Sequence, residues 1–182
     1  MEENLILDDG HYMGLALEQA AGAFDRGEFP VGCVIVQDGK VVAIGARQGT
    51  TSDKPFCSEI DHAEIRALKF LETIDTRFDP AKAVLYVTME PCLMCFGAII
   101  LTGIKKIVYA YEDPMGGGTH CDLKKLPPLY EKCGIKVVPG VLRQRSLDLF
   151  YCFFNKNNNL YWKNSYLEAY TRDQKMKEIR EK

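Results

Sequence analysis

The chain has 182 residues, 47% of them hydrophobic and 26% charged, as in a globular domain large enough to bury a core without disulfides. The formal net charge is −2 and the sequence pI is about 6.0, which excludes a broad basic surface for nucleic acid. The acidic start MEENLILDD lacks the features of a signal peptide, and the apolar runs are no longer than a strand. We therefore expect a cytoplasmic protein with no membrane-spanning segment.

Seven cysteines are spread through the chain: Cys33, Cys57, Cys92, Cys95, Cys121, Cys133 and Cys152. An odd number of cysteines in a chain with no export signal argues against a disulfide framework. The thiols are then free to bind a metal ion.

The first third of the chain predicts a helix followed by a β-hairpin. Apolar side chains recur at helical spacing over residues 13–24. Two apolar runs, 31–36 and 40–46, flank the dipeptide Asp38-Gly39, which is typical of a tight hairpin turn. The polar stretch 48–60 predicts a loop.

The rest of the chain predicts further helices and strands. The helices are expected over residues 62–72, 91–103, 145–154 and 159–182, and the strands over 83–89, 105–111 and 134–140. Strands that alternate with helices favour an α/β fold, a three-layer α/β/α sandwich. With no repeat or long linker, we predict one domain over residues 1–155 and a helical extension over 156–182.

Two short motifs carry the chemistry. The motif Cys92-x-x-Cys95 alone is typical of either a redox pair or a metal site. The chain also contains His62-Ala63-Glu64, and the order H-x-E followed by P-C-x-x-C is the signature of zinc nucleobase deaminases. Both motifs lie at predicted helix starts.

The spacing of these residues suits a catalytic zinc ion. Residues three apart share one face of a helix, so Cys92 and Cys95 can reach the same ion, and His62 supplies a third ligand. A water molecule takes the fourth position, where zinc lowers its pKa toward neutrality. Glu64 is then the expected proton carrier, first as a base and then as an acid.

Beyond these motifs, the chain resembles the cytidine-deaminase-like superfamily, in the branch with tRNA adenosine, guanine and cytosine deaminases. The similarity runs from about residue 14 to about residue 154, through FPVGCVIVQDGKVVAIG, HAEIRAL, YVTMEPCLMCFGAII and IKKIVYAYEDP. It implies a five-stranded mixed sheet between helices, a catalytic Zn²⁺ and a homodimer. It also implies that Phe29 and Val31 form a pocket wall and that the backbone N–H of Ala63 holds the substrate. His120, in a Gly-rich loop, is a candidate for the pocket edge.

One stretch departs from the family pattern. Relatives commonly carry an asparagine shortly after the second strand, where its amide holds the base. Here the stretch reads GARQGTTSD, with Arg47 or Gln48 in that place. Arg47 is therefore a candidate substrate-binding residue, and the identity of the base stays open.

The function that these residues predict is hydrolytic deamination of a free base, nucleoside or nucleotide, with release of ammonia. A tRNA-specific adenosine deaminase is the alternative, although the acidic charge balance does not favour tRNA. A third interpretation is a non-catalytic interaction module, in which Cys57 completes a Cys₃His zinc site. A redox pair is least favoured, because it leaves His62 and Glu64 without a role.

Overall fold

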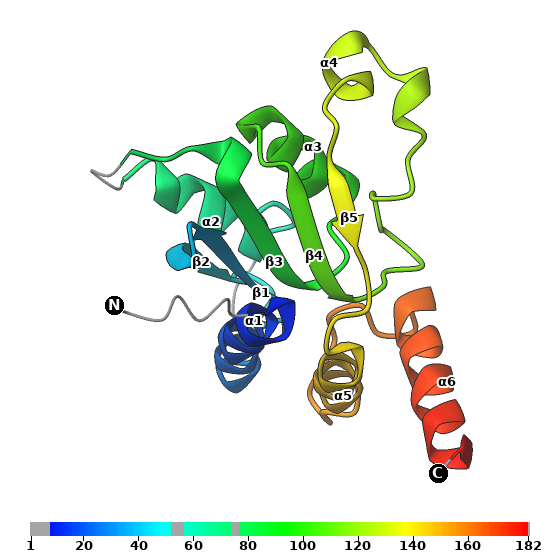
Figure 1. Ribbon diagram of the computed structural model, residues 1–182. Helices are drawn as coiled ribbons and strands as arrows, with labels where there is room; N and C mark the ends of the chain where they lie inside the picture. The colour runs from blue at the N-terminus through cyan, green and yellow to red at the C-terminus, as the bar shows by residue number, and fades with distance from the viewer. Residues whose placement is uncertain (1–7, 52–56, 74–76, 182) are drawn as a thin grey trace.

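The structure is a computed structural model that describes residues 8–51, 57–73 and 77–181. Its centre is a five-stranded sheet in the order β2-β1-β3-β4-β5 (Figure 1). The strands are β1 (Gly32–Gln37), β2 (Lys40–Ala46), β3 (Ala83–Met89), β4 (Lys106–Tyr111) and β5 (Lys136–Val138). β1 is antiparallel to β2 and β3, whereas β3, β4 and β5 are parallel. The prediction of a five-stranded mixed sheet is confirmed.

The hairpin of β1 and β2 turns at the dipeptide that predicted it. Asp38 and Gly39 both have left-handed backbone conformations, with φ of 50° and 76°. Two consecutive left-handed residues are what a tight type I′ turn requires. The predicted loop that follows β2 lies partly outside the described residues.

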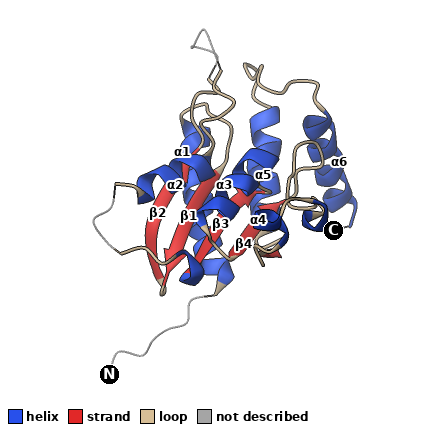
Figure 2. Cartoon of the chain, turned by 90° about the horizontal axis from the view of Figure 1, so that it is seen from above, coloured by secondary structure: helices blue, strands red, loops and turns tan. Residues whose placement is uncertain are grey.

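Helices cover both faces of the sheet. They are α1 (Asp9–Asp25), α2 (Ala63–Leu71), α3 (Leu93–Thr102), α4 (Pro128–Glu131), α5 (Arg143–Phe154) and α6 (Tyr166–Glu181). Two short 3₁₀ turns, η1 (Pro80–Lys82) and η2 (Leu123–Lys125), complete the element order. α1 and α5 lie on one side of the sheet, α2 and α3 on the other, and α6 lies beside α5 (Figures 1 and 2). This is the predicted three-layer sandwich.

Successive side chains of a strand point to opposite faces of the sheet, so the buried residues form two clusters, one on each face. Val34 and Tyr86 pack with α1, whereas Cys33, Ile35 and Leu85 belong to the larger cluster that includes residues of α2 and α3. α1 lies very close to the sheet at Gly32, where a Cβ atom would meet the carbonyl oxygen of a helix residue at 2.1 Å. Within the described ranges, no helix has the length and apolar character needed to cross a bilayer.

The C-terminal segment differs in part from the prediction. The helix expected over residues 159–182 begins only at Tyr166, so the prediction is wrong for the first seven residues. Trp162 and Asn164 have left-handed backbone conformations, with φ of 54° and 62°, which a right-handed helix cannot contain. α6 then packs against the core: Leu167 is buried, and the hydroxyl of Thr171 lies 3.2 Å from that of Tyr111 at the end of β4.

Candidate active site

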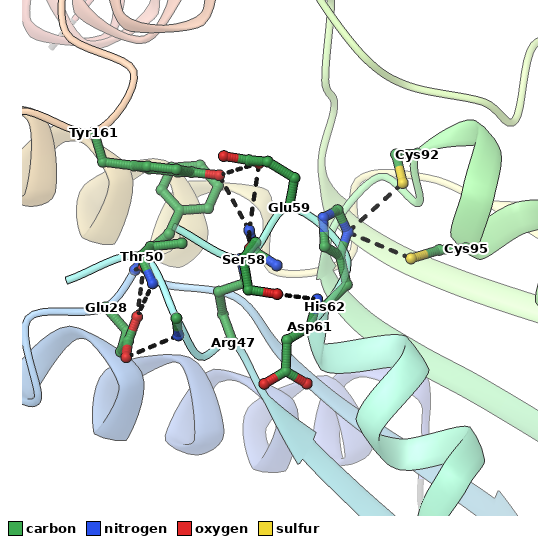
Figure 3. A network of polar contacts seen from close by, with 12 residues as sticks. Glu28, Arg47, Thr50, Ser58, Glu59, Asp61, His62, Cys92, Cys95 and Tyr161 are labelled. Atoms are coloured by element: carbon green, nitrogen blue, oxygen red, sulfur yellow. Dashed lines mark hydrogen bonds and ion pairs between the residues drawn. The ribbon is translucent and has the colours of Figure 1, made fainter. Parts of the chain in front are cut away.

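A cluster of three metal-binding side chains lies between the starts of two helices. His62 is the N-cap residue of α2, Cys92 is the N-cap residue of α3, and Cys95 lies in the first turn of α3. The Nδ1 atom of His62 is 3.6 Å from the Sγ atom of Cys92 and 3.4 Å from that of Cys95 (Figure 3). Within the described part of the chain, only these three residues form a group of potential metal ligands with all ligand atoms inside 4.8 Å. Cys57 is described and is not a member.

The electrostatics of the cluster match a zinc site. Hydrogen bonds from Cys95 and from His62 lower the pKa of the Cys92 thiol to about 4, against the opposing effect of burial. Cys95 has a raised pKa, because it shares a hydrogen bond with Cys92 and is buried. One imidazole nitrogen and two cysteine sulfurs, one of them readily ionised, are a donor set that zinc prefers. These residues therefore fit a zinc ion.

A carboxyl group lies beside this cluster. Glu64, in the first turn of α2, is only 3% exposed and lines the same cavity as His62. Burial raises the pKa of its carboxyl above the ordinary value, although the positive charge of His62 acts in the opposite direction. A buried carboxyl with a raised pKa holds a proton more readily than an ordinary carboxyl, as a group that both accepts and releases protons requires.

The cavity has a volume of about 220 Å³. Four of the candidate substrate-binding residues line it, namely Phe29, Val31, Arg47 and Ala63. His120 is not among the lining residues. Its side chain is 82% exposed, and its Nδ1 atom lies 3.1 Å from a carboxylate oxygen of Glu90. His120 thus contacts Glu90, which lines the cavity, and does not line the cavity itself.

Arg47, and not Gln48, is the residue after β2 that enters the cavity wall. It is 2% exposed. Its Nη2 atom donates to the carbonyl oxygen of Ser58 at 2.7 Å and to the hydroxyl of Tyr161 at 3.1 Å (Figure 3). A carboxylate oxygen of Glu59 lies 3.6 Å from the same nitrogen.

Several lining residues were not predicted from the sequence: Glu59, Met89, Glu90, Asp113, Met115, Gly116, Tyr161, Trp162 and Leu167. The last three belong to the predicted C-terminal extension, for which the sequence indicated only a helix. Glu90 could have been suspected, because it directly precedes the Pro-Cys motif at the end of β3. Its carboxylate accepts from the hydroxyl of Thr119 at 2.5 Å and from the backbone N–H of Asp113 at 3.1 Å, and so holds the loop after β4.

The sequence and the fold are both similar to those of known deaminases. The family described as "Cytidine and deoxycytidylate deaminase zinc-binding region" matches residues 7–111. The tRNA-specific adenosine deaminase of Bacillus subtilis (strain 168) is 33% identical over 152 residues, which cover 81% of this chain and 89% of the relative. That of Agrobacterium fabrum (strain C58 / ATCC 33970) is 33% identical over 147 residues, covering 80% of this chain and 93% of the relative.

Two solved structures extend this similarity to the fold. A deaminase from structural studies of A-to-I editing at the wobble position of transfer RNA has a TM-score of 0.61 and 33% identity. The match covers 76% of this chain and 98% of that one. The protein NE0047 in complex with 2,6-diaminopurine has a TM-score of 0.62 and 25% identity, with 84% of each chain covered. The family match covers more than half of this chain. The chain therefore belongs to the cytidine and deoxycytidylate deaminase family and is a zinc-dependent hydrolytic deaminase.

Proposed function

We propose that this deaminase acts on a small molecule that contains a nucleobase, replacing an exocyclic amino group by a carbonyl. The observation that carries the proposal is the buried carboxyl of Glu64, which lines one cavity of about 220 Å³ together with His62 and Cys92. The reaction consumes one water molecule and releases ammonia. A carbon–oxygen bond forms at the amino-bearing carbon, and the carbon–nitrogen bond to the amino group breaks.

In this proposal, His62, Cys92 and Cys95 hold the zinc ion. Zinc lowers the pKa of a water molecule that it binds, so that hydroxide is available near neutral pH. A set of three protein ligands is typical of catalytic zinc sites, whereas structural sites use four. The rival Cys₃His module requires Cys57 as a fourth ligand, and the absence of Cys57 from the described cluster speaks against it.

Glu64 carries the protons in the proposed mechanism. Its carboxylate takes a proton from the attacking water and passes it to the ring nitrogen beside the amino-bearing carbon. It then takes the remaining proton from the added hydroxyl group as the carbonyl forms, and gives it to the amino group, which leaves as ammonia. Burial raises the pKa of Glu64, which strengthens the carboxylate as a proton acceptor. Its low exposure also keeps competing water away.

The walls of the cavity suit a flat, partly apolar ring. Phe29 and Val31 are both buried and present apolar side chains from the segment that leads into β1. Ala63 lies between His62 and Glu64 at the start of α2, where backbone N–H groups have no intrahelical partner. We propose that the backbone N–H of Ala63 donates a hydrogen bond to the substrate. We also propose that Arg47 contacts the edge of the substrate ring that faces away from the zinc ligands.

Charge favours a small substrate over RNA. The described residues that line the cavity include four carboxylates, those of Glu59, Glu64, Glu90 and Asp113, against the one guanidinium of Arg47. A phosphate backbone at this opening would meet mostly like charge. The tRNA-specific adenosine deaminases among the relatives support the second candidate, an adenosine in a tRNA anticodon.

An ammonia-release assay separates the two candidates. The substrates are free bases, nucleosides, nucleotides and an anticodon stem-loop, each at low and high salt. We expect turnover of a free base or nucleoside with little dependence on salt. Turnover of the stem-loop alone, lost steeply as salt rises, would instead assign the tRNA activity.

We also propose a homodimer. α3 carries an exposed stripe at helical spacing, where Leu93 is 62% and Leu101 is 64% exposed. Gly97 lies between them, and a Cβ atom there would meet nothing within 4 Å. An apolar stripe with a flat centre suits close packing against a second copy. Light scattering tests this proposal, and Leu101→Glu should shift a dimer to monomers.

A further inference from the structure

Of the two terminal nitrogens of the Arg47 guanidinium, only Nη2 has hydrogen-bond partners among the described residues. Its Nη2 atom donates to Ser58 and Tyr161, whereas its Nη1 atom has no hydrogen-bond partner among the described residues and is shielded from solvent. Nearly all buried polar groups in proteins are paired, and an unpaired buried donor is destabilising. Arg47 thus lines the cavity and carries, at Nη1, a buried hydrogen-bond donor that has no partner among the described residues.

We propose that Arg47 determines substrate specificity, because Nη1 donates to an oxygen of the substrate. This inference rests on the proposed function and narrows it to one chemical class. An asparagine amide offers both a donor and an acceptor, but an arginine offers donors alone. The preferred substrate then carries, besides the amino group that is removed, a carbonyl oxygen on the edge that faces Arg47. Such amino-oxo bases include the cytosine and guanine types, and adenine lacks the oxygen.

The charges around Arg47 favour a neutral oxygen over an anionic one. The carboxylate of Glu59 lies 3.6 Å from Nη2 and partly balances the guanidinium charge. Glu64, Glu90 and Asp113 line the same cavity. A phosphate or carboxylate on the substrate would meet these groups as like charges, whereas a carbonyl oxygen needs only the donor.

Tyr161 positions the guanidinium. Its hydroxyl accepts from Arg47 and donates to Glu59 at 2.9 Å, so it holds the two charged side chains together (Figure 3). Its ring packs against Phe29, with the ring centroids 5.4 Å apart. Because Nη1 is shielded, contact with a substrate oxygen requires the side chains that surround it to move. Tyr161 belongs to the irregular segment between α5 and α6, which suits such a shift.

Matched pairs of substrates test the inference on the zinc-loaded protein. Guanine and 2-aminopurine differ by the presence of the oxo group, and so do cytosine and 4-aminopyrimidine. We expect the wild type to prefer the oxo member of the pair that it accepts by about 10- to 100-fold in kcat/KM. In Arg47→Met this ratio should fall toward one. Arg47→Lys should also lose it, because an ammonium cannot place its donors where the guanidinium fork does.

Arg66→Met is the matched control. Arg66 lies on α2, pairs with Asp61 at 3.2 Å and is not among the cavity-lining residues. The variant Arg66→Met should keep the wild-type ratio of kcat/KM between the two members of a substrate pair. Dissociation constants for the same pairs, measured with zinc-loaded Glu64→Gln, give a readout that does not depend on turnover.

The outcomes separate the two proposals. A wild-type ratio near one, or a ratio that Arg47→Met and Arg47→Lys leave intact, would overturn the role of Arg47 while the deaminase activity stands. Turnover of none of these bases would instead remove the proposed substrate class. In that case, tighter binding of the oxo member by Glu64→Gln, lost on adding Arg47→Met, would still support the contact with Arg47.

Discussion

The carbonyl oxygen of Ala63 lies directly against the α-carbon of Gly45. A Cβ atom built on Gly45 would be 2.0 Å from that oxygen and 2.8 Å from the backbone nitrogen of Ala67. Gly45 is a residue of β2 and Ala63 is the first residue of α2, so the missing side chain lets the start of the helix rest on the strand. Because Ala63 lies between His62 and Glu64 in the chain, this close contact also fixes how far those two residues lie from the sheet.

Gly45→Ala should therefore displace the start of α2. We expect a loss of roughly 1–3 kcal/mol in the free energy of unfolding, together with reduced zinc content and turnover. Urea unfolding and metal analysis measure both effects. Gly14→Ala, in α1, is the control, because a Cβ atom there meets only one arginine nitrogen at 4.0 Å. Wild-type stability and zinc content in Gly45→Ala would contradict the importance of this contact.

Metal analysis should find about one zinc per chain in the purified protein. Cys92→Ser and His62→Ala should each lose most of it, because two remaining ligands bind zinc weakly. Cys57→Ser should retain it, since Cys57 is outside the ligand cluster. If Cys57→Ser lost the metal as well, the site would be a closed structural one, and the catalytic assignment would fail.

Glu64→Gln should abolish most of the turnover while it keeps the fold and the zinc. The amide has nearly the same shape but cannot carry a proton, so kcat should fall by at least about 100-fold. Steady-state ammonia release, zinc content and Tm are measured on the same preparation. A variant that kept most of its activity, or that lost its zinc, would show that Glu64 has another role.

Thr171→Val tests whether the C-terminal helix belongs to the core. The hydroxyls of Thr171 and Tyr111 lie 3.2 Å apart and both residues are fully buried, so the variant leaves a buried hydroxyl unpaired. We expect it to lower the free energy of unfolding by about 1–3 kcal/mol. Thr171→Ser, which keeps the hydroxyl, should lose less. Equal stability of all three proteins would indicate that α6 adds little to the fold.

Asp9 should make stability depend on pH. Partial burial raises the pKa of its carboxyl, but hydrogen bonds from Lys106 and Tyr86 outweigh this effect and leave the pKa below its ordinary value. The stabilising contribution is thus complete above the unfolded pKa of about 3.9 and disappears as the pH falls through the lower, folded value.

The wild type should then be more stable than Asp9→Asn at pH 7, and the difference should shrink as the pH falls below the unfolded pKa of about 3.9 and vanish below the folded one. Urea unfolding at several pH values measures this. Asp25→Asn, at an exposed position of the same helix, is the control. A stability difference for Asp9→Asn that stayed constant with pH would refute the proposed ion pair.

Much of the fold follows from local sequence patterns. The hairpin turn at Asp38 and Gly39 requires left-handed residues, which few dipeptides supply at low cost. α3 ends at Gly103, which has φ of 92° and stops the helix as its sequence predicts. The helix predicted to begin at residue 159 fails because Trp162 and Asn164 adopt left-handed conformations. The true start is marked by Ser165, whose hydroxyl accepts from the backbone N–H of Glu168 as in a capping box.

The metal cluster was predictable because each motif is local and lies at a helix start. His62 and Cys92 are the N-cap residues of α2 and α3, and the sheet brings those two ends together. The environment of Arg47 was not predictable in the same way. Tyr161 lies 114 positions away along the chain and reaches the guanidinium only because α5 and the segment after it return to the cavity. The sequence by itself determined which residues are candidates to bind zinc and, as proposed here, to move a proton, since their types and spacing suffice. Only the tertiary structure decided that Arg47 is buried, bonded on one side and faced by acidic groups, because those relations join segments with no shared local pattern.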